Sequence, residues 1–82
     1  MEKISEQQLL QLIQKNLKIE SSAINPNSTS NEIAEWDSLG HLSILVALDE
    51  ALDKKVGSIK EMAGAYSVPK ILELLKKHSL IS

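Results

Sequence analysis

Apolar residues recur at helical spacing near both ends of this chain. The first such segment covers about residues 5 to 17 and opens on Ser5-Glu6-Gln7-Gln8, which has the form of a capping box. The last segment follows Ser67, which is expected to be an N-cap, tolerates Pro69 in its first turn and ends near Lys76-Lys77-His78. The pattern therefore predicts two amphipathic helices, with apolar positions at Leu9, Leu10, Leu12, Ile13 and Leu17 and at Val68, Ile71, Leu72, Leu74 and Leu75.

A third helix is predicted in the middle of the chain, from Asp37 or Ser38 to about Asp53. Its end is indicated by Asp53-Lys54-Lys55-Val56-Gly57, which supplies cations and a glycine stop. Apolar residues cover more than one narrow stripe, so we expect a central helix that is buried on most of its sides. These residues are Leu39, Leu42, Ile44, Leu45, Val46, Ala47, Leu48 and Leu52.

Two further segments complete the pattern. The sequence Ser58-Ile59-Lys60-Glu61 resembles a second capping box and predicts a short helix that Gly64 limits. Residues 18 to 35 hold a cluster of Ser, Asn, Thr and Pro and predict a long loop, since a proline disfavours helix at the residue before it. Four apolar residues are expected to anchor this loop, namely Ile19, Ile24, Ile33 and Trp36.

Composition narrows the class of protein. With 82 residues, 43% hydrophobic content, no Phe and only one Trp and one Tyr, the chain predicts one all-α domain, residues 1–82, with an aliphatic core. No cysteine and only two histidines predict no metal site. A net charge of −2 argues against a nucleic-acid partner. A polar N-terminus and the lack of a long apolar run predict a cytoplasmic protein without a membrane partner.

The candidate chemistry lies where the middle helix begins, at Trp36-Asp37-Ser38-Leu39-Gly40-His41-Leu42. The first backbone N–H groups of a helix lack intrahelical partners and carry partial positive charge. A phosphodiester on Ser38 would therefore be stabilised there. Asp37 is expected to cap the same helix, while Leu39 and Leu42 are expected to turn inward and so fix the direction in which the serine points.

These residues resemble the Asp-Ser-Leu motif of acyl carrier proteins, and the resemblance extends from Ser5 to about His78. It implies a four-helix bundle with three longer helices, one short helix and a long loop between helices one and two. It also implies that Ser38 carries 4′-phosphopantetheine, donated by coenzyme A, whose thiol holds intermediates as thioesters. On this view the chain is not an enzyme but a substrate of its partner enzymes.

The resemblance also assigns expected contacts. Asp37 would be read by the phosphopantetheinyl transferase that modifies the serine. Further partners would be acyl or aminoacyl ligases and transferases, together with the acyl cargo, and we expect a monomer. Partner contact is assigned to apolar Leu39 and Leu42, to Asp49, Glu50 and Glu61 for electrostatic steering, and to Met62 as an adaptable contact near the arm. Each could instead be an ordinary core or solvated residue.

One feature departs from carriers of fatty-acid synthesis, which place carboxylates just after the modified serine. Here those positions hold Gly40, His41 and Ser43. We therefore expect a dedicated carrier for a specialised pathway, loaded by its own ligase or transferase. An aminoacyl or peptidyl carrier remains an alternative, since these variants share the architecture.

The residues around Ser38 also permit two other classes of protein, an enzyme and an adaptor. Asp37, Ser38 and His41 contain the residue types of a nucleophilic triad, but a small bundle offers little room for an oxyanion hole and a walled cleft. His41 is instead expected to be a polar residue on an exposed helix face. An unmodified helical adaptor that binds a partner through Leu39 and Leu42 would leave the serine at the helix start unexplained.

Overall fold

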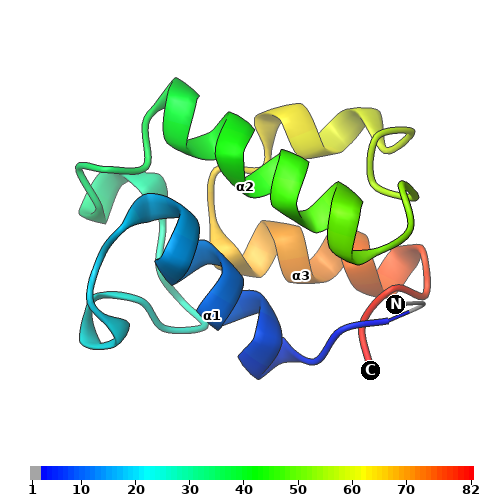
Figure 1. The fold of residues 1–82 in the computed structure, drawn as a ribbon, viewed down its shortest axis with the longest axis horizontal. Helices are drawn as coiled ribbons and strands as arrows, with labels where there is room; N and C mark the ends of the chain where they lie inside the picture. Colours follow the sequence, from blue (N-terminus) through cyan, green and yellow to red (C-terminus); the bar gives the residue numbers. More distant parts are fainter. Residues whose placement is uncertain (1–2) are drawn as a thin grey trace.

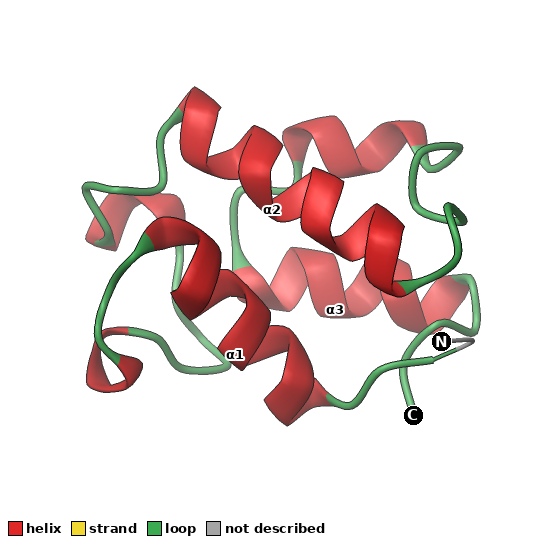
Figure 2. Cartoon of the chain, viewed as in Figure 1, coloured by secondary structure: helices red, strands yellow, loops and turns green. Residues whose placement is uncertain are grey.

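The computed structural model describes residues 3–82 and contains three α-helices joined by loops and 3₁₀ turns (Figures 1 and 2). Met1 and Glu2, part of the N-terminus predicted to be polar, lie outside the described part. The prediction of an all-α fold is confirmed, since residues 3–82 contain no strand and only two isolated β-bridges. The elements are α1 (Glu6–Leu17), η1 (Ser21–Ala23), η2 (Ser30–Glu32), α2 (Ser38–Ala51), η3 (Lys60–Gly64) and α3 (Val68–Lys77).

Helix α1 begins and ends as its sequence predicts. Its capping box is complete, because the Gln8 backbone N–H donates to Ser5 Oγ at 3.1 Å and the Ser5 N–H donates to Gln8 Oε1 at 2.8 Å. Lys18 ends the helix in the left-handed region, with φ of 57°. The apolar face, with Leu9, Ile13 and Leu17, is buried against the core.

Helix α3 also follows its prediction. Ser67 caps it by accepting the Lys70 backbone N–H at 3.2 Å, Pro69 lies in the first turn, and His78 is the C-cap. Five residues of this helix are buried, namely Val68, Ile71, Leu72, Leu74 and Leu75.

Helix α2 ends at Ala51, slightly before the predicted end near Asp53. The chain turns after α2 at Asp53 and Lys54, whose φ angles are 56° and 65°. Two non-glycine residues therefore adopt the left-handed conformation, whereas Gly57, the predicted stop, does not. Asp49 stabilises this turn: its Oδ1 accepts the backbone N–H groups of Val56 at 3.1 Å and Gly57 at 2.8 Å.

The short element between α2 and α3 is a 3₁₀ helix, η3, and the predicted capping box at Ser58 is wrong. Ser58 Oγ donates backwards to the Lys55 carbonyl at 3.3 Å, and Ile59 precedes η3 without a side-chain cap. Burial of Ile59 and Met62 fixes this segment against α2. Within residues 3–82, three of the four expected helices are therefore α-helices, and the short one is the 3₁₀ helix η3.

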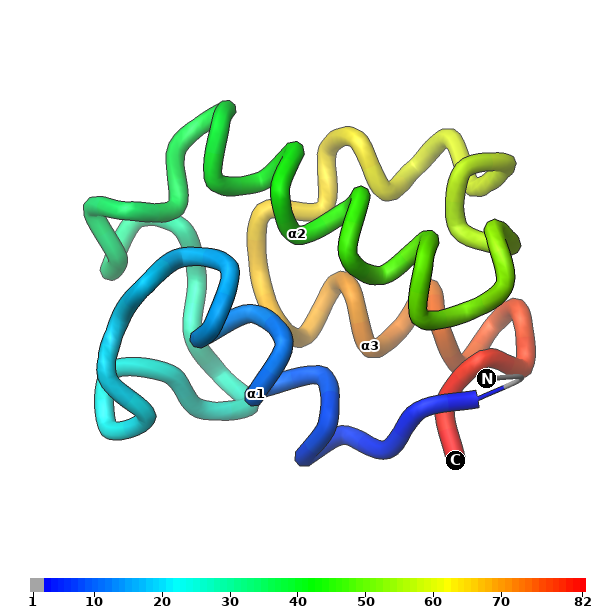
Figure 3. Tube along the Cα trace, in the orientation of Figure 1, coloured from blue at the N-terminus to red at the C-terminus, as the bar shows by residue number. Residues whose placement is uncertain are grey.

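The long loop between α1 and α2 is held by its apolar anchors, as predicted. Ile24, Ile33 and Trp36 are buried, and Ile19 is partly buried against the core. Backbone hydrogen bonds also tie the loop to the start of α3: the Val68 N–H donates to the Ser28 carbonyl at 2.9 Å, next to an antiparallel bridge between Thr29 and Ser67. Figure 3 shows the loop folding back beside α1 before it reaches α2.

Helices α1, α2, η3 and α3 pack around one aliphatic core, in which α1 and α2 make the most extensive contact. The two ends of the described segment lie side by side, because Ile4 forms a parallel bridge with Ile81 (Figure 1). None of the helices within residues 3–82 combines the length and the apolar character needed to cross a membrane.

Candidate functional site at the start of helix α2

Ser38 is the first residue of α2, and its side chain is exposed. Asp37 caps the helix as predicted, with Oδ1 accepting the Gly40 backbone N–H at 2.8 Å. The hydroxyl therefore lies in solvent at the positive end of the helix dipole. An anionic ester on Ser38 Oγ would be stabilised by this dipole and would need no rearrangement of the core.

Gly40 allows the preceding loop to close over the first turn of α2. A Cβ at this position would clash with the Glu35 carbonyl oxygen and would approach Cδ2 of Leu17 to 2.7 Å. A larger residue would push α2 away from both neighbours. Gly40 is thus a packing requirement of the segment that presents Ser38.

His41 is buried, with only 3% of its surface exposed, so its prediction as an exposed polar residue is wrong. Its Nδ1 accepts the Trp36 indole N–H at 3.0 Å, and its Nε2 lies 2.8 Å from the Met62 carbonyl oxygen. The ring also stacks on Tyr66, with ring centroids 4.1 Å apart. Burial is tolerated because both ring nitrogens have partners.

The hydrogen bonds of His41 do not form a nucleophilic triad with its neighbours. Its two nitrogens contact Trp36 and Met62, and the Asp37 carboxylate contacts the Gly40 N–H. A triad requires the histidine to bond the nucleophile and the acid to bond the histidine. These groups instead join the loop, α2 and η3 around the base of Ser38.

Leu39 and Leu42 are exposed beside Ser38, with exposed fractions of 76% and 57%, so the expectation that they turn inward is wrong. Their exposure is compatible with the expected contact with a partner. Val46 lies one turn further along and is 51% exposed. Sequence reasoning missed Val46 as a surface residue because it assigned most sides of α2 to the core. A signal in the sequence could have identified it: positions 39, 42 and 46 share one face of the helix. That face is offset from the face of the buried residues His41, Ile44 and Leu48.

The expected steering acids lie on two different elements, α2 and η3. Asp49 is half-buried and holds the turn after α2 through Val56 and Gly57. Glu50 is exposed on α2. Glu61 belongs to η3 and lies 3.9 Å from Lys77 Nζ in an exposed ion pair. Such exposed pairs are weak, so Glu61 remains accessible.

Met62 lies in the core, contrary to its expected role as an adaptable contact near the arm. Only 1% of its surface is exposed. Its carbonyl oxygen is the group that accepts from His41. Met62 therefore belongs to the core that packs against the site and does not line the surface of the site.

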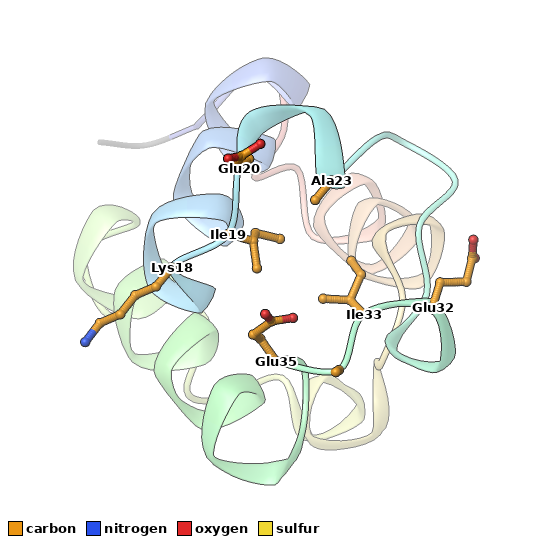
Figure 4. A pocket seen from close by; sticks show the side chains of 8 residues that line it. Lys18, Ile19, Glu20, Ala23, Glu32, Ile33 and Glu35 are labelled. Carbon is orange, nitrogen blue, oxygen red and sulfur yellow. The ribbon is translucent and has the colours of Figure 1, made fainter.

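Two of the surface hollows border the loop before α2 or the exposed side of α2. One, of about 340 Å³, lies between the end of α1 and the loop before α2, and its lining includes Ile19, Ile33 and Glu35. Figure 4 shows the Glu35 side chain directed toward Ile19, while Lys18 and Glu32 point away. The other hollow, of about 330 Å³, is a groove between α1 and α2 lined by Asn16, Leu42, Ser43, Val46, Ala47 and Glu50. Only the second contains residues exposed beside Ser38.

In residues 3–82, no three His, Asp or Glu side chains are grouped in a way that could hold a metal ion. Comparison with protein-family models, curated proteins and solved structures gave no match to this chain. The sequence motif and the geometry around Ser38 are therefore the features that bear on function.

Proposed function

We propose that this chain is a carrier protein that holds acyl intermediates as thioesters on a 4′-phosphopantetheine arm attached to Ser38. The observation that carries the proposal is the exposed Ser38 hydroxyl at the first residue of α2, beside its cap Asp37. When bound, the arm supplies a thiol, which this cysteine-free chain otherwise lacks. The chain itself supplies the attachment point and the surface around it.

The arrangement of elements supports an acyl-carrier-type bundle. Three α-helices occur in the expected order, the long loop precedes the modified serine, and η3 occupies the place of the short helix. The departure is the 3₁₀ geometry of η3, which the buried side chains of Ile59 and Met62 hold against the core.

Attachment would need only groups that the site presents. Ser38 Oγ would form a bond to the phosphorus of coenzyme A that bears the pantetheine, the bond from this phosphorus to the adenosine bisphosphate would break, and the hydroxyl proton would be released. A phosphopantetheinyl transferase with Mg²⁺ would catalyse this step. The product is a phosphodiester, whose negative charge suits the N-terminus of α2.

We further propose a non-catalytic, monomeric, cytoplasmic carrier for a specialised pathway. Both nitrogens of His41 are engaged away from Ser38, which argues against intrinsic catalysis. Gly40 and His41 occupy positions where fatty-acid-synthesis carriers place carboxylates, and both are needed for packing. Loading by a dedicated acyl or aminoacyl ligase, without elongation by a general fatty-acid synthase, would support this assignment, and efficient general elongation would refute it.

The test is intact mass after incubation with coenzyme A, Mg²⁺ and a phosphopantetheinyl transferase. The wild-type chain should gain the mass of one arm, Ser38→Ala should gain none, and Ser43→Ala should gain one. Ser43 is a matched control, because it is an exposed serine in the interior of the same helix. An unmodified adaptor would gain nothing in any variant, and a gain that survives Ser38→Ala would assign the arm to another residue.

A further inference from the structure

The exposed segment that carries Ser38 lies between two buried side chains. Residues 37 to 39 are exposed, whereas Trp36 before them and His41 after them each have only 3% of their surface exposed. The Trp36 indole N–H donates to His41 Nδ1 at 3.0 Å. This hydrogen bond, which we call the Trp36–His41 bond, therefore joins the two ends of the exposed segment on its core side.

Aromatic packing surrounds this bond. The chain contains one Trp, one Tyr and no Phe, and both Trp36 and Tyr66 lie against His41. The ring centroid of His41 is 6.1 Å from that of Trp36 and 4.1 Å from that of Tyr66, with 23° and 22° between the ring planes. Stacked aromatic pairs of this kind are stabilising. The orientation of the His41 ring is therefore fixed by packing as well as by hydrogen bonds.

The two nitrogens of His41 serve different parts of the fold. Nδ1 accepts from Trp36, which precedes the cap residue Asp37, whereas Nε2 donates to the carbonyl oxygen of Met62 in η3 at 2.8 Å. The first bond restrains the chain where it enters α2, and the second fixes a segment 21 positions further along. An effect of His41 on Ser38 can therefore be assigned to one nitrogen or to the other by substitution.

The place of Ser38 depends on this entrance to α2. Within the first turn, Asp37 Oδ1 accepts the Gly40 N–H and the Asp37 carbonyl accepts the His41 N–H, each at 2.8 Å. These bonds hold the turn itself, whereas the Trp36–His41 bond holds the turn to the loop before it. In an enzymatic reaction, a displacement of about 1 Å can cost about a hundredfold in rate. A small shift of the loop would therefore slow attack by Ser38 Oγ without unfolding the chain.

We propose that His41 is a positioning residue for the attachment of the arm to Ser38, and that it acts through Nδ1 and the Trp36–His41 bond. Because His41 is buried, it acts on the hydroxyl only through Trp36 and the backbone that follows. This proposal rests on the function proposed above and adds a requirement for one nitrogen of one residue. A purely structural role would instead make the rate of modification follow the stability of each variant, whichever nitrogen lost its partner.

Two substitutions of His41 separate its two bonds. His41→Asn places an amide oxygen near the position of Nδ1, so it keeps an acceptor for Trp36 and loses the bond to Met62. His41→Gln places an amide nitrogen near the position of Nε2, so it keeps a donor for Met62 and leaves the Trp36 N–H without its acceptor. Trp36→Phe removes the same bond from the other side and keeps an aromatic ring. Tyr66→Phe is the matched control, because it retains the stacked ring and leaves the Trp36–His41 bond intact.

The test measures modification of the full-length chain by a phosphopantetheinyl transferase with coenzyme A and Mg²⁺, under conditions where urea unfolding shows every variant to be folded. We expect kcat to fall about tenfold in His41→Gln and in Trp36→Phe, with KM for the carrier changed less than about twofold. His41→Asn and Tyr66→Phe should keep kcat within about twofold of the wild type. The double variant of Trp36→Phe and His41→Gln should be no slower than either single variant, because both remove one bond.

Hydrogen exchange gives a readout that needs no enzyme. The Gly40 backbone N–H, which donates to Asp37 in the first turn of α2, should exchange faster in His41→Gln and Trp36→Phe than in the wild type. In His41→Asn its exchange should stay close to that of the wild type, even where the free energy of unfolding has fallen.

Three results would overturn the proposal while Ser38 is still modified. One is an equal kcat for His41→Asn and His41→Gln, which would limit His41 to a structural role, and another is a slow His41→Asn beside a normal His41→Gln, which would assign the effect to Met62. The third is a wild-type kcat in Trp36→Phe, which decides the matter even if both His41 variants unfold. If the wild-type chain gains no arm, the proposed function itself fails, while hydrogen exchange still reports whether the Trp36–His41 bond restrains the turn.

Discussion

The indole N–H of Trp36 donates a hydrogen bond of 3.0 Å to Nδ1 of His41. Since an indole nitrogen can only donate, Nδ1 must be the acceptor, and the proton of the neutral ring lies on Nε2, which donates to the Met62 carbonyl at 2.8 Å. One histidine therefore connects the residue before Asp37, the first turns of α2 and the segment η3. This connection holds the backbone that presents Ser38.

Replacement of His41 by Ala should lower the free energy of unfolding by about 3 kcal/mol, because it leaves a cavity and removes the partners of Trp36 and Met62. His78→Ala, at an exposed site, should change it by less than about 0.5 kcal/mol. Urea unfolding followed by fluorescence of Trp36, the sole tryptophan, measures both changes. Equal stability of the two variants would show that the His41 bonds contribute nothing.

Substitution of Gly40 by Ala should destabilise the fold by about 1 to 3 kcal/mol, because the added Cβ meets the Glu35 carbonyl and Leu17. Gly64→Ala is the matched control. A Cβ there has no neighbour within 4 Å and the glycine has no positive φ, so stability should stay constant or rise by up to about 1 kcal/mol. Thermal unfolding of both variants decides the matter, and a harmless Gly40→Ala would contradict the close packing.

Asp49→Ala should cost about 1 to 3 kcal/mol, since two backbone N–H groups, of Val56 and Gly57, lose their acceptor. The neighbouring Glu50→Ala should change stability by less than about 0.5 kcal/mol. Hydrogen exchange at the amides of Val56 and Gly57 gives the local readout. Unchanged exchange in Asp49→Ala would indicate that the turn is held by other contacts.

Two substitutions of Asp37 separate its capping role from its charge. Asp37→Ala should cost about 1 kcal/mol because the Gly40 N–H loses its acceptor, whereas Asp37→Asn should keep the cap and cost less than about 0.5 kcal/mol. If the modifying enzyme reads the carboxylate, Asp37→Asn should fold normally and yet be modified slowly. Denaturation and modification rates measured on the same samples test this, and a normal rate in Asp37→Asn would limit Asp37 to capping.

Local patterns predicted most of the fold. The boundaries of α1 and α3 followed from Ser5 and Ser67, whose caps involve residues only three positions away. The capping box at Ser58 failed because the same local pattern is compatible with a backward bond to Lys55, and burial of Ile59 and Met62 decided between them. Local sequence cannot decide between two arrangements that differ in their tertiary contacts.

The site could likewise be predicted only where it depends on neighbouring residues in the sequence. The position of Ser38 and its cap follows from neighbouring residues, so both could be predicted. The burial of His41 depends on Tyr66 and Met62, which are more than twenty positions away, and no periodic pattern records such contacts. The roles of Asp49 and Met62 were missed for a similar reason, because folding sets both. Asp49 accepts backbone N–H groups of the following turn, whereas Met62 is buried in the core and its carbonyl accepts from His41.

The most direct measurement of the central claim is the location of the added arm along the chain. After modification and trypsin digestion, the peptide from Ile19 to Lys54 contains both Ser38 and Ser43, and its fragment ions separate these two residues. We expect the whole added mass to lie on Ser38 and the released arm to bear one free thiol. Added mass on Ser43 or on a loop serine, or an unmodified peptide after complete reaction of a known carrier in the same tube, would contradict it.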